Sequence, residues 1–567
     1  MRKTIFTLCV RTTRLLPVFI GLFAATSIYA GSATWDLNPT SSDWNTAVNW
    51  TPDTVPNGPL DTATFAVSNT TDVSLMTTTE VNSIVFNSGA SPFVISVLGQ
   101  GSSPSTLTIS GAGVINNSAI TQQLVTGPAA AGGVGNITLT GNAIMGSLMT
   151  VTNEGGGADG ITLADNASAG DAIFVNEGGK KINHGQAGST RFVGNATAAA
   201  GTFFCETGSG GGHFGAFGGN VRFSDSSTAA NGSYVLEGAP VADAGGGYVL
   251  FYDTSSAGNG VFTLSGSDAA VGGGAYMQFY DDSSAGNATL IVNGGTMDGG
   301  QINFFGDSTG DTARLQLFGN GTLNAYETRT EPLTIGSLEG DGIVLLGYET
   351  LIIGSNSLST VFSGTIEDST FYTGGALVKT GTGTLTLRGT NIYTGGTTVS
   401  QGTLVVANTT GSATGTGAVA VDAGTLGGSG TVAGAITVGT GSGAGAVLAP
   451  AAGSKVPSTL ITSSTLALNA DATYVYTGRV KGRRVQTDVV VANGVTINGA
   501  TFSSRLRVTG TPQAGTVLTV ISNTSANPIS GTFNNLPDGG IVTINGNNFQ
   551  ADYEGGDGND LTLTVIP

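Results

Sequence analysis

The stretch from Gly374 to Val406 restricts the fold of this 567-residue chain more than any other. It contains three short runs in which apolar and polar residues alternate, Ala376–Lys379, Thr384–Leu387 and Thr397–Val406, with glycine- and asparagine-containing turns between them. Such alternation predicts strands with one buried face, and the stretch has no helical period. Three strands and three turns make roughly one coil of a β-solenoid, which buries its apolar face only against neighbouring coils.

The same stretch resembles the autotransporter-associated β-strand repeat, also called the passenger-associated transport repeat. The residues that carry the resemblance are Gly374, Gly375, Lys379 to Leu385, Gly389 to Asn391, Tyr393 to Val399 and Gly402 to Leu404. Gly424 to Thr431 and Leu448 to Pro450 are similar to segments that follow such repeats. The resemblance implies an exported bacterial protein with a right-handed parallel β-helix; it does not imply an enzyme.

Residues 1–30 have the pattern of a secretory signal peptide. A region with four basic residues precedes an apolar core, Leu15–Thr26, that is too short for a permanent membrane helix. We expect cleavage after Ala30, with an uncleaved anchor as the alternative. No later stretch has eighteen consecutive apolar residues, so we expect no transmembrane helix in the mature chain.

Composition restricts the partners. The net charge is −18, and removal of four signal-peptide cations makes it −18 − 4 = −22. This charge argues against nucleic acid and anionic lipid as partners. Charged residues are only 10% of the chain, against about 25% in ordinary domains, so Ser, Thr, Asn and Gly must dominate the surface. Cys205 has no partner for a disulfide once Cys9 leaves with the signal peptide.

The three tryptophans, Trp35, Trp44 and Trp50, lie close together near the amino terminus. The first coil of a solenoid has no neighbour on one side, and large aromatic side chains cover the most area per residue. We therefore predict an N-terminal cap at residues 31–70. The alternative is a tryptophan platform on which sugars stack.

A degenerate repeat fills positions 163–318, and its length varies from copy to copy. The copies start near Leu163, Phe192, Phe223, Phe251, Phe279 and Phe304. Two columns separated by one position are apolar throughout and are predicted to face the core. The first is Ile173, Phe203, Tyr234, Phe262, Leu290 and Leu315; the second is Val175, Cys205, Leu236, Leu264, Val292 and Leu317. Cys205 is therefore predicted to be a core residue rather than a reactive thiol.

Polar residues form further columns in these copies. Asp171, Asn231, Asn259 and Asn287 are predicted to form a side-chain ladder at one corner. Nearby carboxylates could instead bind calcium; they are Asp225, Asp253, Asp281, Asp282 and Asp307. His184 and His213 are interpreted as turn residues, with a shared metal site as the alternative.

The last part of the chain offers two further features. The largest basic cluster of the mature chain is Arg479, Lys481, Arg483 and Arg484, interpreted as a charged turn or as a contact to acidic polysaccharide or a partner. Residues 555–560, Gly-Gly-Asp-Gly-Asn-Asp, resemble a calcium-binding nonapeptide, but a single copy favours a hairpin turn. Nothing after Tyr553 has the pattern of membrane-barrel strands, so we expect a passenger without a translocator.

Together these patterns predict an all-β, right-handed parallel β-helix with β caps at both ends. The expected regions are a signal peptide (1–30), an N-terminal cap (31–70), a β-helix with degenerate repeats (71–330), a β-helix containing the 374–406 repeat (331–480) and a C-terminal cap (481–567).

The expected role is a non-catalytic structural or adhesin-like one, secreted or at the cell surface. We assign no catalytic, cofactor-binding or metal-binding residue, and name surface polysaccharide or other cell-surface components as partners. The alternative is a polysaccharide lyase or hydrolase on the same fold, which needs paired carboxylates or basic residues in a groove.

Overall fold

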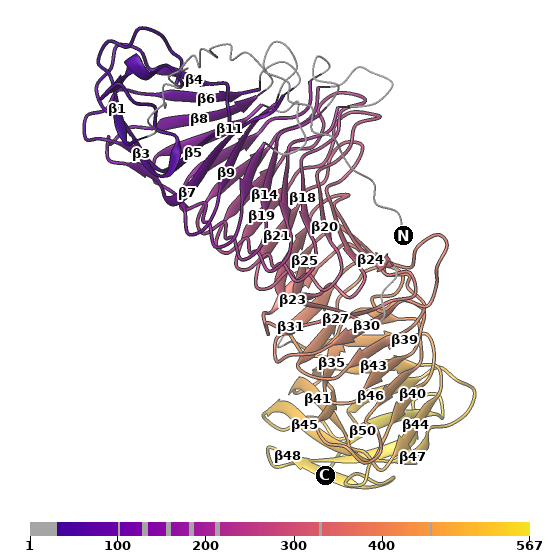
Figure 1. Cartoon of the computed structure of the whole chain (residues 1–567). Coiled ribbons are helices and arrows are strands. Elements are labelled where there is room, and N and C mark those ends of the chain that lie inside the picture. The colour runs from indigo at the N-terminus through magenta and orange to yellow at the C-terminus, as the bar shows by residue number, and fades with distance from the viewer. Residues whose placement is uncertain are drawn as a thin grey trace, which may run out of the picture.

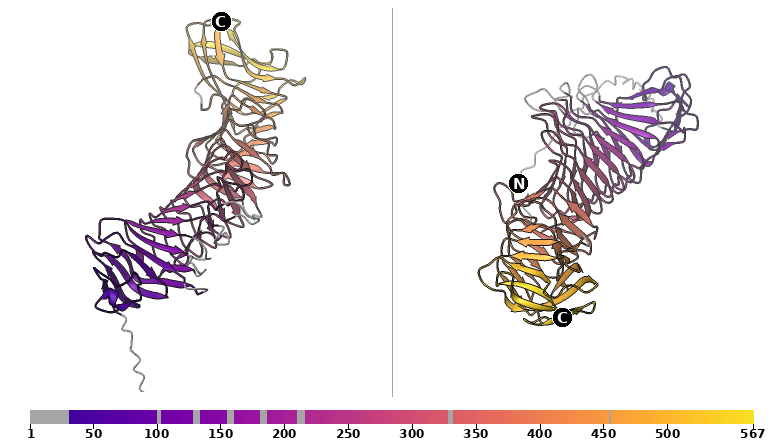
Figure 2. Two further views of the ribbon diagram at one scale, coloured as in Figure 1. Left: turned by 90° about the horizontal axis from the view of Figure 1, so that it is seen from above. Right: turned by 180° about the vertical axis from the view of Figure 1, so that it is seen from behind.

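The computed structural model describes residues 31–99, 103–127, 134–154, 160–180, 186–209, 216–327, 332–453 and 456–567. The signal-peptide prediction lies outside these residues. The protein is a long, bent stack of parallel strands, with the described ends at opposite extremes (Figure 1, Figure 2). The helical structure of the described residues is one 3₁₀ turn, η1 (Ala47–Asn49), and no helix there is long and apolar enough to cross a membrane. The prediction of an all-β parallel β-helix is confirmed.

Sheet 1 forms one side of the N-terminal two thirds. Its pairings are parallel except at the first strand pair, β1–β2, and β10 pairs with β7. In spatial order its strands are β2 (Trp50–Thr51), β1 (Ala33–Trp35), β3 (Gly58–Phe65), β5 (Thr79–Phe86), β7 (Ser105–Asn116) with β10 (Ile144–Met145), β9 (Gly135–Leu139), β12 (Ile161–Leu163), β14 (Ser189–Phe192), β16 (Asn220–Phe223), β18 (Tyr248–Phe251), β20 (Tyr276–Phe279), β22 (Gln301–Phe305), β24 (Thr322–Glu327), β26 (Ile343–Leu345) and β29 (Thr365–Glu367).

Sheet 2 forms the second side of the same coils. Its strands are β4 (Asp72–Leu75), β6 (Val94–Leu98), β8 (Gln122–Gly127), β11 (Met149–Asn153), β13 (Ile173–Asn176), β15 (Thr202–Cys205), β17 (Ser233–Leu236), β19 (Val261–Leu264), β21 (Thr289–Val292), β23 (Gly310–Leu317) and β25 (Leu333–Gly340). A third side is reduced to single bridges, which run from Ile144 through Ser168 to Thr309.

The coil changes its cross-section at β25. The first residues of this strand pair with β27 and its last residue pairs with β28, so two ladders leave one strand. Ladder 2a is β27 (Thr350–Ile353), β30 (Ala376–Lys379), β32 (Thr397–Val399), β34 (Val419–Val421), β37 (Ile436–Val438), β40 (Leu466–Leu468), β44 (Val495–Asn498) and β47 (Ser530–Thr532). Ladder 2b is β28 (Thr360–Phe362), β31 (Thr384–Leu387), β33 (Thr403–Val406), β35 (Gly424–Gly428), β38 (Ala446–Leu448), β41 (Ala472–Lys481) with the antiparallel β42 (Arg484–Thr487), and β45 (Thr501–Thr509).

Sheet 3 closes the C-terminal end. Its strands are β36 (Thr431–Val432), β39 (Thr459–Thr462), β43 (Val489–Ala492), β46 (Val517–Asn523), β50 (Asp560–Ile566), β49 (Asn547–Gly555) and β48 (Ile541–Ile544). Pairing is parallel up to β43–β46 and antiparallel from β46 to β48. The hairpin predicted at 555–560 is confirmed, because Gly555 pairs with Asp560 at the β49–β50 turn.

The tryptophans cover the first coil. Trp35, Trp44 and Trp50 are at most 1% exposed, and their rings contact one another at centroid distances of 5.0 Å. Phe65 packs beneath Trp50 at 5.6 Å and stacks on Phe86 at 5.4 Å. Rings buried in this way close the end of the core and offer no open face for a sugar.

The repeat at 163–318 has the predicted register along Sheet 1. Leu163, Phe192, Phe223, Phe251, Phe279 and Phe304 pair one after another in successive coils. Along Sheet 2 the predicted columns hold from Phe203 onward but are wrong by one residue in the first copy. Phe174 is buried and Ile173 is 41% exposed, while Asn176 lies in the core beside Cys205. Thr190 donates a hydrogen bond to the Asn176 Oδ1 (2.8 Å), which allows a polar residue at a core position.

The stretch 374–406 holds more than the single coil predicted. The predicted strands Ala376–Lys379 and Thr384–Leu387 are confirmed, but the third run divides into β32 and β33. β32 stacks directly on β30, with Leu377 opposite Thr397, and β33 stacks on β31, with Thr384 opposite Thr403. One coil therefore already ends where the third predicted run begins. The coil is shorter than predicted because its third side has no regular strand.

Candidate functional site

The outward side of Sheet 1 carries a group of stacked aromatic side chains in the repeat region. In β18, Val249 and Phe251 face the core, so Tyr248 and Leu250 face outward; both are nevertheless only 7% exposed. We call this surface the tyrosine face. Its residues are Ser189, Asn220, Arg222, Tyr248, Leu250, Tyr252, Tyr276, Gln278, Tyr280 and Phe305.

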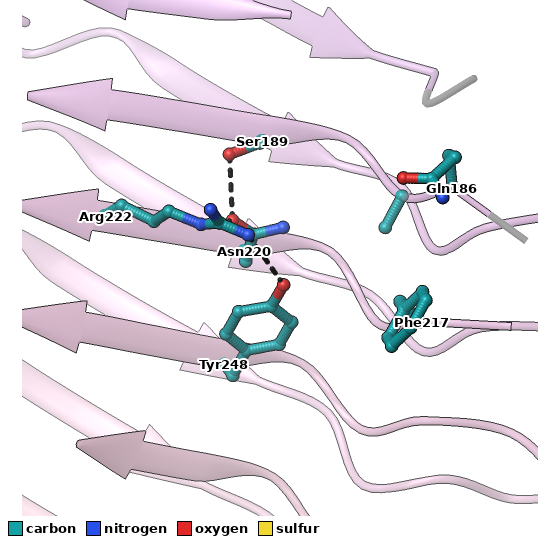
Figure 3. A pocket seen from close by; sticks show the side chains of 7 residues that line it. Gln186, Ser189, Phe217, Asn220, Arg222 and Tyr248 are labelled. Atoms are coloured by element: carbon teal, nitrogen blue, oxygen red, sulfur yellow. Dashed lines mark hydrogen bonds between the residues drawn. The ribbon is translucent and has the colours of Figure 1, made fainter. Parts of the chain in front are cut away.

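A pocket of about 240 Å³ lies at one end of the tyrosine face (Figure 3). Its lining residues are Gln186, Ala187, Ser189, Phe217, Asn220, Arg222 and Tyr248. The Arg222 Nε donates to the Asn220 Oδ1 at 3.0 Å, and Nη2 donates to the Tyr248 hydroxyl at 3.2 Å. Ser189 Oγ also donates to the Asn220 Oδ1, at 2.8 Å. The network fixes a guanidinium beside the exposed ring of Phe217.

Beyond the pocket the aromatic rings stack coil on coil. Tyr248 and Tyr276 lie 4.8 Å apart with ring planes within 3°. Tyr252, Tyr280 and Phe305 form a second stack, with distances of 5.0 and 4.7 Å. Burial raises the pKa of Tyr252 and Tyr276, and neighbouring tyrosines raise it further, while Arg222 opposes this. The Tyr252 and Tyr276 hydroxyls therefore remain neutral donors at physiological pH.

The polar columns predicted from the sequence are ladders within the turns. Asn287 donates to Asn259, and Asn259 donates to Asn231, each at 3.2 Å; Asp171 is separated from them by Ala200. The ladder is therefore confirmed for three of its four predicted members.

The candidate calcium ligands form a second ladder. Asp225, Asp253 and Asp281 have positive φ angles near 55°, and the carboxylates of Asp253 and Asp281 accept the backbone N–H of the preceding coil's Asp at 2.9 and 3.1 Å. Asp282 and Asp307 occupy the next column. Among the described residues no group of three or more His, Cys, Asp or Glu side chains is placed to hold a metal ion.

Cys205 is fully buried, and burial raises the pKa of its thiol, so the prediction that it is a core residue is confirmed. His184 and His213, considered for a metal site, lie outside the described residues.

The sequence interpretation missed a row of glutamates. Glu154, Glu177, Glu206 and Glu237 directly follow β11, β13, β15 and β17 and stack in successive coils. Burial, followed by the charges of Glu177 and Glu237, raises the pKa of Glu206. Lys180 forms an ion pair with Glu177. The signal that could have revealed the row is a Glu near the end of the second core column in three successive copies, Glu177, Glu206 and Glu237, preceded by Glu154 one coil earlier.

The basic cluster predicted at 479–484 is confirmed as an exposed hairpin of β41 and β42. The structure adds two residues that the sequence interpretation missed, Arg505 and Arg507, because β45 pairs with β41 in parallel.

The fold and these surfaces define a class: a parallel β-helix whose coils are joined by side-chain ladders. Residues 377–406 match the family model described as passenger-associated-transport-repeat. A crystal structure of the Haemophilus influenzae Hap adhesin is similar over 89% of this chain, with 12% sequence identity and a TM-score of 0.28. This chain spans 59% of that adhesin's length. No curated protein matches the chain.

Proposed function

We propose that the protein is an exported, adhesin-like surface protein whose tyrosine face binds a cell-surface glycan without cleaving it. The observation that carries this proposal is the pairing of stacked rings with a fixed Arg222–Asn220–Tyr248 network beside a pocket on the outward side of Sheet 1. Aromatic rings offer large, rigid contact area, and the fixed polar groups orient a ligand.

The chemistry of the pocket supports binding rather than cleavage. Glycosidic hydrolysis ordinarily requires two carboxylates across the scissile bond. The described residues that line the pocket provide amide, hydroxyl, guanidinium and phenol groups and no carboxylate. The passenger-type repeat at 377–406 supports an exported location.

The test uses the exported chain immobilised on beads and fluorescent neutral polysaccharides: laminarin, galactomannan and soluble cellulose oligomers. We expect retention of at least one of them without change in its length. The double variant Tyr252→Ala/Tyr280→Ala should lose retention at least tenfold, whereas Phe371→Ala, which removes an 87% exposed ring from another loop, should not. Retention that is unchanged in the double variant would refute the role of the tyrosine face.

A second candidate, a polysaccharide-cleaving enzyme, is favoured by the glutamate row. A raised pKa is what a general acid needs, and Glu206 has it between two further carboxylates with Lys180 nearby. Product analysis on neutral and acidic polysaccharides, with and without calcium, decides between the two. Turnover that disappears in Glu206→Gln would replace the adhesin-like proposal; an unchanged substrate length supports binding alone.

A further inference from the structure

The cationic residues of this acidic protein are concentrated at one place near its C-terminal end. Residues 31–567 contain 19 − 4 = 15 Lys and Arg against 37 Asp and Glu. Six of the fifteen lie on β41, β42, β45 and the β41–β42 turn, side by side in the structure (Figure 1). We call them the basic face: Arg479, Lys481, Arg483, Arg484, Arg505 and Arg507.

The register places these charges on one exposed side. Arg479 lies opposite Arg507 in the parallel β41–β45 pair, and Lys481 lies opposite Arg484 in the antiparallel hairpin. Between them Val480, Leu506 and Val508 point inward and are at most 8% exposed. Neighbouring strands are about 4.8 Å apart. The two cations of each pair therefore lie directly beside each other.

Such pairs oppose folding. Like charges directly opposite each other on a sheet are destabilising. Two ion pairs of the described chain, Lys180–Glu177 and Arg314–Glu339, lie away from the basic face. The carboxylate within the hairpin region, Asp488, is buried and accepts backbone N–H groups from Ser458 and Thr477. The charges are therefore not neutralised by this carboxylate, which points to a function that requires them.

An open hollow of about 700 Å³ lies beside the charged residues of the basic face. Its lining residues are Arg479, Val480, Lys481, Arg483, Arg484, Val485, Gln486, Arg507 and Thr509. Guanidinium groups bind carboxylate and sulfate in bidentate fashion. The described part of this lining contains no aromatic ring on which a nucleobase could stack, and no large apolar anchor of the kind that protein interfaces use.

We propose that the basic face binds an acidic polysaccharide, a chain with a carboxylate or sulfate group on its successive sugar units. This site is separate from the tyrosine face, and the inference does not depend on the adhesin-like role. Binding releases counterions from the polyanion, so affinity should fall steeply with salt.

The experiment measures binding of the full exported chain to polygalacturonate and to dextran sulfate from 50 to 500 mM NaCl, with uncharged dextran as the reference polymer. We expect binding to at least one polyanion and none to dextran. Arg479→Gln/Arg507→Gln should weaken binding at least tenfold and reduce its salt dependence. Arg388→Gln, which removes an exposed cation elsewhere on the β-helix, should change it less than twofold.

A second readout keeps the proposal open to refutation if the variant binds poorly for another reason. Because Arg479 and Arg507 repel each other, the double variant should unfold at the same or a higher urea concentration than the wild type. A clear destabilisation would contradict the account of unneutralised like charges. Equal binding to double-stranded DNA or to phosphatidylserine vesicles at the same salt concentration would overturn the assignment to polysaccharide, and so would unchanged polyanion binding by the double variant.

Discussion

The coils at 223–305 and the coil at 374–406 join their neighbours by different means. In the first region the inter-coil contacts are stacked core rings: Phe223, Phe251 and Phe279 lie 4.8–4.9 Å apart with planes within 11°. One polar ladder of this region, Asn231–Asn259–Asn287, is exposed at the turns. A second is buried: the short hydroxyls of Ser227, Ser255 and Ser283 donate to carbonyls of the preceding coil. In the second region longer polar side chains, Lys379 and Asn391, join the coils inside the core.

Two buried polar residues carry the second arrangement. Lys379 is 1% exposed. Its Nζ donates to the carbonyls of Thr380 and Gly381 at the corner of its own coil and, at 3.4 Å, to the Gln401 carbonyl of the next coil. Asn391 is 1% exposed; its Oδ1 accepts the Ile366 N–H at 2.8 Å, and its Nδ2 donates to Ala413. Asn391 replaces the backbone ladder on the side that has no strand, and Lys379 satisfies carbonyls at the corner between β30 and β31, because a buried backbone group needs a partner.

The contrast shows how one fold tolerates two coil lengths. The longer coils, such as the one from Phe251 to Phe279, enclose enough volume for rows of aromatic rings. The shorter coil, from Leu377 to Thr397, does not need such rings, but its third side must obtain hydrogen bonds from side chains. Lys379 and Asn391, which belong to the repeat motif, thus have a structural role that does not depend on transport.

The largest effect is expected where a ring leaves the aromatic stack. Phe251→Ala removes contacts to Phe223, Phe279 and, at 6.0 Å, Phe262, and leaves a cavity between fully buried neighbours. We expect a loss of about 3–5 kcal/mol of local stability. Hydrogen exchange of the β18 amides, read by mass spectrometry, measures it. A loss below about 1 kcal/mol would mean that the stack is not what joins these coils.

The next effect tests the buried amide. Asn391→Ala leaves the Ile366 N–H and the Ala413 carbonyl without this partner, so we expect a loss of about 2–3 kcal/mol. Asn259→Ala, in the exposed ladder, should cost less than about 1 kcal/mol.

The tryptophans show in which part of the chain Asn391→Ala lowers the stability. Trp35, Trp44 and Trp50 report only on the N-terminal end, so Asn391→Ala should shift the urea transition seen by circular dichroism but leave the fluorescence transition in place. A shift of both would show that the two regions unfold as one unit.

Lys379 makes a contribution to stability that depends on pH. Burial lowers the pKa of Lys379 from 10.5 to about 8. Between these values the unfolded chain holds more protons than the folded chain, so this group's contribution to stability increases as pH rises from about 8 to 10.5.

The measurement for Lys379 is a difference between two proteins. The urea stability of the wild type minus that of Lys379→Met should increase by about 2 kcal/mol between pH 8 and pH 10. Subtraction removes the contribution of the other titrating groups. A difference that stays constant with pH would place the ammonium in water rather than in the core.

The sequence was sufficient to predict the bounds of single strands and the register of strands that repeat. Alternation located β30 and β31 to the residue, and the repeated Phe positions predicted the Sheet 1 register. It failed at Ile173 because the core position Asn176 is polar, and its hydrogen bond from Thr190 of the next coil is not visible in the sequence.

What the sequence could not provide is which distant residues meet. The pairing of Arg507 with Arg479 depends on the length of the coil between them, and no repeated position marks that register. Coil length is set by turns of variable length, so a shift of one position in a turn would move each later side chain to the other face.

The smallest expected effect is the most direct test of the contrast between the two kinds of coil, because a tyrosine hydroxyl is removed in each of them. The Tyr234 hydroxyl is buried in the aromatic stack and has no hydrogen-bond partner among the described groups, whereas the Tyr393 hydroxyl bonds to the Thr397 Oγ1 at 2.6 Å. A buried hydroxyl without a hydrogen-bond partner lowers the stability of the folded protein, whereas one with a partner raises it. Tyr234→Phe should therefore stabilise its coil by about 1 kcal/mol, and Tyr393→Phe should destabilise its coil by a similar amount. Urea unfolding of both variants beside the wild type measures the two signs. If both variants change stability in the same direction, polar groups serve the two kinds of coil alike, and the distinction between ring-stacked and hydrogen-bonded coils fails.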